Sequence, residues 1–326
     1  MTTRELGRTG QQVSALGLGC MSMASDYAYG PSDAREATAT LHRALELGIT
    51  FWDTADVYGF GANEELLRPV LQAQRAEVFL ATKFGFVADG QGGTALDVRP
   101  ERIAAACEAS LRRLGVEVID LYYAHRIDPA VPVEEMVGAM ADLVQAGKVR
   151  FLGVSEASAA SLRRAAATHP SAALQSEYSL FTREVEMEIL PVCQELGVSL
   201  VAFSPLGRGL LTTAGPQLAA QDLRRSMPRF DDANLNANAP LLDGLRALAA
   251  AKGCTPAQLA LAWLLAQDAH LLPIPGTKRV KYLEENAAAA DVSLSPTERQ
   301  QLQALLAAHP VAGARYGESA ARLVNR

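Results

Sequence analysis

The chain of 326 residues is 49% hydrophobic and 20% charged, and its net charge is −6, a composition typical of soluble globular proteins. It has no basic run that would indicate nucleic-acid binding, no apolar stretch near the roughly 20 residues that cross a bilayer, and no apolar signal-peptide core at its N-terminus. Its four cysteines are too widely scattered for a metal site. We therefore expect a cytoplasmic protein with reduced thiols.

The first predicted elements are a hairpin, a strand and a helix. Residues 4–14 place two short arms around a Gly-rich turn, which is typical of a small β-hairpin, and residues 15–19 follow as a short strand. Either Ser32 or Asp33 can then cap a helix that continues to Leu47, because their side-chain oxygens accept hydrogen bonds from the free amides of a helix start.

A pattern then repeats along the chain, in which a helical segment ends in glycine and an apolar strand follows within a few residues. Gly48, Gly115, Gly147 and Gly197 stand at these helix ends, where glycine adopts the left-handed conformation that terminates a helix. The strands are near-continuous apolar runs, so we expect both of their faces to be buried, as in a parallel sheet. The eight predicted strands are residues 15–19, 49–52, 78–82, 118–122, 149–154, 173–175, 199–203 and 271–273.

Eight strands that alternate with helices favour an α/β fold, a single closed (β/α)8 TIM barrel, over an open doubly wound sheet. The first strand–helix turn also lacks the Gly-x-Gly-x-x-Gly fingerprint of dinucleotide-binding sheets. No low-complexity linker divides residues 1–326, which indicates one domain. The irregular stretch at residues 206–239 is long enough to be a functional loop. We expect a C-terminal helix beyond Pro296 and a loosely ordered tail after His309.

Four polar residues gather at or just after predicted strand ends. Asp53, Lys83 and His125 close three strands, and Tyr58 lies on the loop after Asp53. The active site of such a barrel lies at the C-terminal ends of its strands. A buried Lys83 needs a partner, which Asp53 can provide, and its charge is expected to lower the pKa of Tyr58. Each residue alone is explained as well by capping, solvation or core packing, but their joint placement predicts one catalytic site, without a metal.

At these residues the sequence resembles the aldo-keto reductases. Residues 53–59 and the strand ends at Lys83 and His125 match that family's catalytic tetrad in order and context, and the resemblance covers nearly the whole chain. It implies an enzyme that uses NADPH to reduce an aldehyde or ketone to an alcohol. In this reaction Tyr58 is expected to protonate the carbonyl oxygen as general acid, while His125 donates a hydrogen bond to the same oxygen.

The resemblance also implies how the cofactor is held, since no side chain can carry a hydride. Ser155 and Gln175 match the residues that hold the nicotinamide carboxamide, and Tyr178 matches the aromatic residue that stacks on the nicotinamide ring. Glu156 stands where many members of the family have asparagine. The blander interpretation of Tyr178 is a packing residue at the barrel rim.

Two later segments resemble the parts of the family that hold the phosphates and the adenine. The loop that begins at Ser204 resembles the one whose backbone wraps the pyrophosphate, and Leu206 and Gly209 belong to it. The second segment follows the last strand and starts a helix, and helix N-termini bind phosphate. Its lysine and arginine can neutralise the 2′-phosphate of NADPH. The residues expected to bind there are Gly276, Thr277, Lys278, Arg279, Glu285 and Asn286.

Two other functions stay open from the sequence. Potassium-channel β subunits share this fold, so the chain could be a nucleotide-sensing regulator, although its intact tetrad favours an enzyme. Lys83 could instead form a Schiff base, as in barrel aldolases, but the charge of Asp53 would keep it protonated and poorly nucleophilic. Turnover of simple aldehydes separates the first alternative, and borohydride trapping of a carbonyl compound on Lys83 tests the second.

The predicted partner is a small carbonyl substrate, with no nucleic acid and no membrane. In this family the substrate pocket is built from loops, here at residues 21–31, 84–99, 126–132 and 206–239. Loops vary more than the scaffold that carries them. The sequence therefore predicts the class of reaction, but neither the individual substrate nor the oligomeric state.

Overall fold

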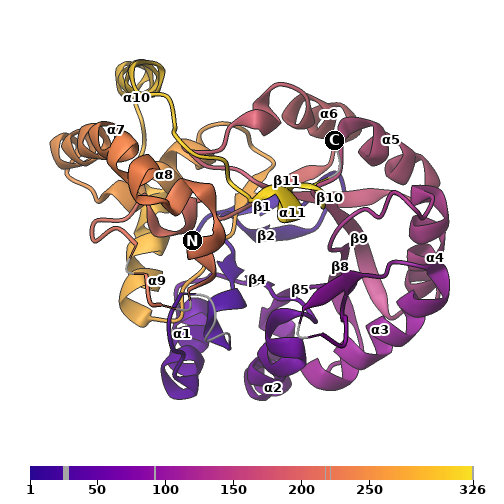
Figure 1. The fold of residues 1–326 in the computed structure, drawn as a ribbon. Helices are drawn as coiled ribbons and strands as arrows, with labels where there is room; N and C mark the ends of the chain where they lie inside the picture. The colour runs from indigo at the N-terminus through magenta and orange to yellow at the C-terminus, as the bar shows by residue number, and fades with distance from the viewer. Residues whose placement is uncertain (25–28, 92, 217, 221, 325–326) are drawn as a thin grey trace.

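Eight parallel strands form the centre of the protein in the computed structural model, which describes residues 1–24, 29–91, 93–216, 218–220 and 222–324 (Figure 1). The strands neighbour one another in chain order. A parallel bridge between Gly19 and Gly276, and a hydrogen bond from Gly17 N to Pro273 O, join the last strand to the first. The sheet therefore closes into the predicted barrel. Its strands are β3 Leu18–Gly19, β4 Phe51–Asp53, β5 Phe79–Phe84, β8 Ile119–Ala124, β9 Val149–Ser155, β10 Ser171–Glu177, β11 Ser199–Phe203 and β12 Leu271–Pro273.

Most of the helices lie around the outside of this barrel, whereas the short helix at residues 318–321 lies over the strands in this view (Figure 1). Asp33 rather than Ser32 caps the first helix and accepts hydrogen bonds from the amides of Arg35 and Glu36. The four predicted helix-ending glycines all have positive φ angles, between 67° and 73°, so their role as left-handed terminators is confirmed. The helices are α1 Ala34–Glu46, α2 Ala62–Gln74, α3 Pro100–Leu114, α4 Val133–Gln145, α5 Ala159–Thr168, α6 Ile189–Leu196, α7 Asp232–Lys252, α8 Pro256–Leu265, α9 Val280–Ala287, α10 Pro296–Ala308 and α11 Glu318–Ala321.

The predicted N-terminal hairpin covers the end of the barrel at which the strands begin. It pairs β1 Thr3–Glu5 with β2 Gln12–Ser14, and Leu6 in its turn packs with the apolar side chains that fill the barrel interior. Arg4 donates a hydrogen bond of 2.7 Å to the carbonyl of Leu271 at the start of β12. Because this end is plugged, the opposite end, where the strands terminate, is left for a site.

A second hairpin follows β5 and was not predicted. It pairs β6 Phe86–Ala88 with β7 Thr94–Leu96, inside the loop that the sequence assigned to the substrate pocket. Residues 25–28, 92, 217 and 221 of the predicted pocket loops lie outside the described part of the chain. None of the described helices is long and apolar enough to cross a membrane.

Two predictions about the second half of the chain are wrong. The loop expected at residues 206–239 is shorter, because α7 already begins at Asp232. The tail after His309 is not loosely attached. The backbone of Ala312 exchanges hydrogen bonds of 2.8 and 3.0 Å with Asn238, which lies buried on α7, and Ala314 accepts one from the amide of Arg229. The tail is thereby fixed across the C-terminal end of the barrel.

Candidate active site

A cavity of about 1310 Å³ opens at the C-terminal ends of the strands. Its volume is above the usual range for small-ligand pockets, about 300–1,000 Å³, and so has room for a dinucleotide and a substrate together. Most of the predicted site residues line it. These are Asp53, Tyr58, His125, Gln175, Ser204, Leu206, Gly209, Gly276, Thr277, Lys278, Arg279, Glu285 and Asn286.

Lys83 and Asp53 form a buried ion pair below the cavity floor. The side chain of Lys83 is inaccessible to solvent, and its ammonium donates to Asp53 Oδ1 and, at 2.8 Å, to the carbonyl of Thr54. The other oxygen of Asp53 accepts a 2.8 Å hydrogen bond from Gln175. Burial acts to lower the pKa of Lys83, but the charge of Asp53 outweighs this effect, and the net pKa lies above its usual value. The lysine therefore stays protonated, which disfavours its use as a Schiff-base nucleophile.

Tyr58 lies over this pair at the cavity wall. The Lys83 ammonium is 5.2 Å from the centroid of its ring. Burial raises the pKa of Tyr58, and although the Lys83 charge opposes this effect, the net pKa lies above its usual value. The predicted direction of the lysine's influence is confirmed, but the predicted net lowering is wrong, because burial outweighs the charge. Tyr58 is consequently a protonated phenol at neutral pH.

His125 completes the group, with its ring edge-on to Tyr58 at a centroid distance of 5.9 Å. Burial and the charges of Lys83 and Arg126 hold the pKa of His125 well below its usual value. The imidazole is therefore neutral near pH 7. Its Nδ1 atom is buried and makes no hydrogen bond to any described residue, so the ring has no structural partner at that atom.

The neutral state of His125 predicts a specific pH dependence of stability. Below about pH 6.5 the unfolded chain takes up a proton that the folded site excludes, so folding stability should fall as the pH is lowered. For one such group the loss is up to about 2 kcal/mol between pH 8 and pH 5. Urea unfolding should show a smaller acid-side loss for H125Q than for the wild type. The exposed-histidine variant H42Q serves as the control and should keep the wild-type loss.

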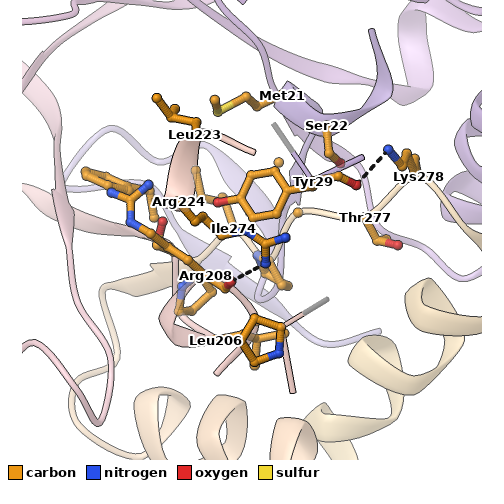
Figure 2. A pocket seen from close by; sticks show the side chains of 18 of the residues that line it. Met21, Ser22, Tyr29, Leu206, Arg208, Leu223, Arg224, Ile274, Thr277 and Lys278 are labelled. Atoms are coloured by element: carbon orange, nitrogen blue, oxygen red, sulfur yellow. Dashed lines mark hydrogen bonds between the residues drawn. The ribbon is translucent and has the colours of Figure 1, made fainter. Parts of the chain in front are cut away.

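The end of the cavity at which the sequence predicts phosphate binding is rich in cations. Figure 2 shows Lys278 donating to the backbone oxygen of Tyr29, at 3.1 Å, and the Arg224 guanidinium beside the Tyr29 ring, 4.7 Å from its centroid. Arg224 also donates a 2.9 Å hydrogen bond to Arg208 O. Tyr29 thus meets Arg224, from a segment far away in the sequence, beside this part of the cavity.

Three predicted residues are not found in the described cavity lining. Lys83 lies behind Asp53, as above. Ser155 is buried, and its hydroxyl accepts a 3.3 Å hydrogen bond from Arg126. Tyr178 is fully buried, packs edge-on against Trp263 with centroids 5.5 Å apart, and donates to a glutamate at 2.9 Å. These contacts agree with the alternative interpretation of Tyr178, as a residue that packs at the barrel rim.

Comparisons with known proteins agree with the function that this arrangement of residues indicates. The model of the Aldo/keto reductase family matches residues 15–307. The aldo-keto reductase yakc of Schizosaccharomyces pombe, whose name specifies NADP(+), is 44% identical over 323 residues, which span 96% of this chain and 94% of that protein. The chain belongs to the aldo/keto reductase family. It is accordingly an oxidoreductase, as the tetrad residues predicted.

Solved structures of other aldo/keto reductases and related enzymes share its fold. A glycerol dehydrogenase from Gluconobacter oxydans superimposes with a TM-score of 0.85 at 30% identity, over 96% of this chain and 97% of its own. An aldo/keto reductase from Klebsiella pneumoniae, solved with NADP and acetate, gives a TM-score of 0.72 at 29% identity, over 97% and 99% of the two chains. The predicted barrel is therefore confirmed by comparison as well as by its strand order.

Two buried ion pairs beside the cavity of this aldo/keto reductase were not predicted from the sequence. Glu156 accepts hydrogen bonds of 2.9 and 2.6 Å from Arg315 of the tail, and Glu177 accepts one of 2.9 Å from Arg208. Burial acts to raise the pKa of Glu156, but the bonds from Arg315 hold it below its usual value. An acid at the end of a buried strand signals that a cation must reach it, although the pattern does not say which one.

Proposed function

We propose that this aldo/keto reductase reduces an aldehyde or ketone to an alcohol, with Tyr58 as the general acid. The observation that carries the proposal is the position of Tyr58, which stands at the cavity wall between the buried Lys83 charge and the neutral ring of His125. A proton donor is needed there, because a carbonyl oxygen gains negative charge as its carbon is reduced.

The protonation states favour Tyr58 over His125 as the acid. The pKa of His125 lies well below its usual value, so the neutral ring can donate a hydrogen bond but holds no readily released proton. The pKa of Tyr58 lies above its usual value, so the phenol is protonated and available. Lys83 remains charged next to the phenol and stabilises the phenolate as it forms.

The lining of the cavity fits NADPH as the cofactor, and bound NADPH supplies the hydride. Cations outnumber acids among the described lining residues at the phosphate end, where only Glu285 is acidic. The backbone of Gly276 lies close to the carbonyl of Gly19, which a β-carbon would meet at 3.3 Å, so a larger residue would crowd this part of the lining. Lys278 and Arg279 stand directly before α9, and their positive charges at a helix start support the proposal that they bind the 2′-phosphate. The name of the yeast relative and the NADP in the Klebsiella structure support this choice.

The reaction is tested by following NADPH absorbance with a panel of aliphatic and aromatic aldehydes and ketones. At least one compound should be turned over at an ordinary enzymatic rate, about 1–10³ per second. If NADPH binds but none of the carbonyl compounds is reduced, the proposal fails and a nucleotide-sensing role is favoured instead. All four cysteines are free thiols, which supports the predicted cytoplasmic location of such an enzyme.

Removing the two cations before α9 should change the choice of cofactor. Charge-assisted hydrogen bonds contribute about 1.5–3 kcal/mol each, so K278A/R279A should lose at least about tenfold in affinity for NADPH and much less for NADH. Fluorescence titration of both cofactors measures this difference. R112A, which removes an exposed arginine of α3, is the control. Equal losses for NADPH and NADH would mean that the pair does not bind the 2′-phosphate.

A further inference from the structure

Arg126 follows the catalytic-site histidine directly and lines the same cavity. Its Nη1 donates to the carbonyl of His125 at 2.6 Å and to the hydroxyl of Ser155 at 3.3 Å. The guanidinium lies 6.0 Å from the centroid of the Phe86 ring, and that ring packs edge-on against His125 at 5.0 Å. Three neighbouring groups therefore hold Arg126 in place beside the reacting end of the cavity.

The charge of Arg126 has no carboxylate partner among the described residues, in contrast to other arginines of the lining. Arg208 pairs with Glu177 at 2.9 Å, and Arg224 pairs with an aspartate at 2.7 Å. The charge of Arg126 helps to lower the pKa of Glu156. The ion-pair partner of Glu156, however, is Arg315. Because Arg126 lines the cavity and has no counter-ion among the described residues there, an anion that arrives with a ligand would supply the missing partner.

The free part of the side chain has the shape that recognises such an anion. Only Nη1 of Arg126 is hydrogen-bonded within the described structure, which leaves the edge formed by Nε and Nη2. This edge presents two parallel N–H groups that bind a carboxylate or phosphate through paired hydrogen bonds. The charge also reaches the catalytic groups, because Arg126 contributes to lowering the pKa of His125.

We propose that Arg126 binds an anionic group of the substrate, so that the preferred substrates are aldehydes or ketones carrying a carboxylate or phosphate near the carbonyl. This inference rests on the proposed carbonyl reduction. Arg126 acts as a specificity-determining residue and takes no part in the proton transfer from Tyr58.

The kinetic test compares pairs of related carbonyl compounds in which only one member carries an anionic group. The pairs are 4-oxobutanoate with butanal, 4-carboxybenzaldehyde with its methyl ester, and glyceraldehyde 3-phosphate with glyceraldehyde. The wild type should prefer the anionic member in kcat/KM, and R126M should reduce that preference by at least about tenfold. R126K keeps the positive charge but lacks the paired N–H groups of a guanidinium, so its preference for the anionic member should lie between those of the wild type and R126M. The control R112M should keep the full preference. The pair with the larger preference shows whether the site favours carboxylate or phosphate.

A binding experiment separates this inference from the proposed reaction. Calorimetry of benzoate and of inorganic phosphate with the NADP⁺ complex should show binding that R126M weakens at least about tenfold, while NADPH affinity stays near wild type. The inference is overturned if R126M weakens charged and neutral substrates equally, or if its main effect is on NADPH, which would assign Arg126 to the cofactor through Ser155. If no carbonyl compound is reduced at all, the proposed reaction fails, and the anion titration alone still decides the role of Arg126.

Discussion

Replacing Tyr58 with phenylalanine should lower turnover by about 10²–10⁴-fold, the usual contribution of general acid catalysis. The substitution removes one hydroxyl and keeps the ring, so the edge-on contact with His125 and the Lys83 ammonium over the ring face are preserved. Folding and NADPH affinity should therefore stay near wild type. Steady-state kinetics on one aldehyde, with fluorescence titration of NADPH beside it, measures both quantities.

A matched control exists in Tyr122, which is fully buried on β8 and stacks on Phe84 at 5.0 Å. Its hydroxyl makes no hydrogen bond to the described residues, so Y122F removes the same atom from outside the site and should keep turnover. If Y58F retains turnover within a few-fold of wild type, His125 is the acid and the proposed mechanism is wrong. A parallel fall of NADPH affinity would instead make Tyr58 a structural residue.

The barrel and the placement of the tetrad could be predicted because both follow from local sequence patterns. Glycine-terminated helices and continuous apolar strands specify parallel βα units, and the carboxyl ends of such strands meet at one end of a barrel. Asp53 and His125 each lie at the end of a predicted strand, so their convergence needed no knowledge of side-chain packing. Their geometry confirms the convergence, with Gln175 as an additional hydrogen-bond donor to Asp53.

Other features could not be predicted, because they depend on contacts between segments far apart in the chain. Arg315 lies 159 positions from Glu156, and no local pattern links the two. The net pKa of Tyr58 was assigned the wrong direction for a similar reason. The charge of Lys83 is visible in the sequence, whereas the depth of burial that outweighs it is a property of the folded cavity. Tyr178 likewise owes its position to packing against Trp263 of α8.

Lys83→Met should abolish most turnover and destabilise the fold by about 3–5 kcal/mol, the usual cost of leaving one partner of a buried ion pair alone. Methionine keeps the length of the side chain but leaves Asp53 with only the hydrogen bond from Gln175. Burial already raises the pKa of Asp53, and Lys83 is the main group that opposes it. In the variant the folded carboxyl should therefore hold its proton to a higher pH than the unfolded one.

The raised pKa of Asp53 in the folded variant makes the stability of K83M depend on pH in a specific direction. A group whose pKa is raised on folding contributes stability below its unfolded pKa, about 3.9 for aspartate, and that contribution is lost as the pH rises. The deficit of K83M should thus grow between pH 4 and pH 8 in urea unfolding. The double variant D53N/K83M removes the buried charge and should recover much of the stability, but not the turnover, because the phenolate of Tyr58 would still lack its cation. A pH-independent deficit below 1 kcal/mol would contradict the buried pair, and wild-type turnover of K83M would exclude Lys83 from the mechanism.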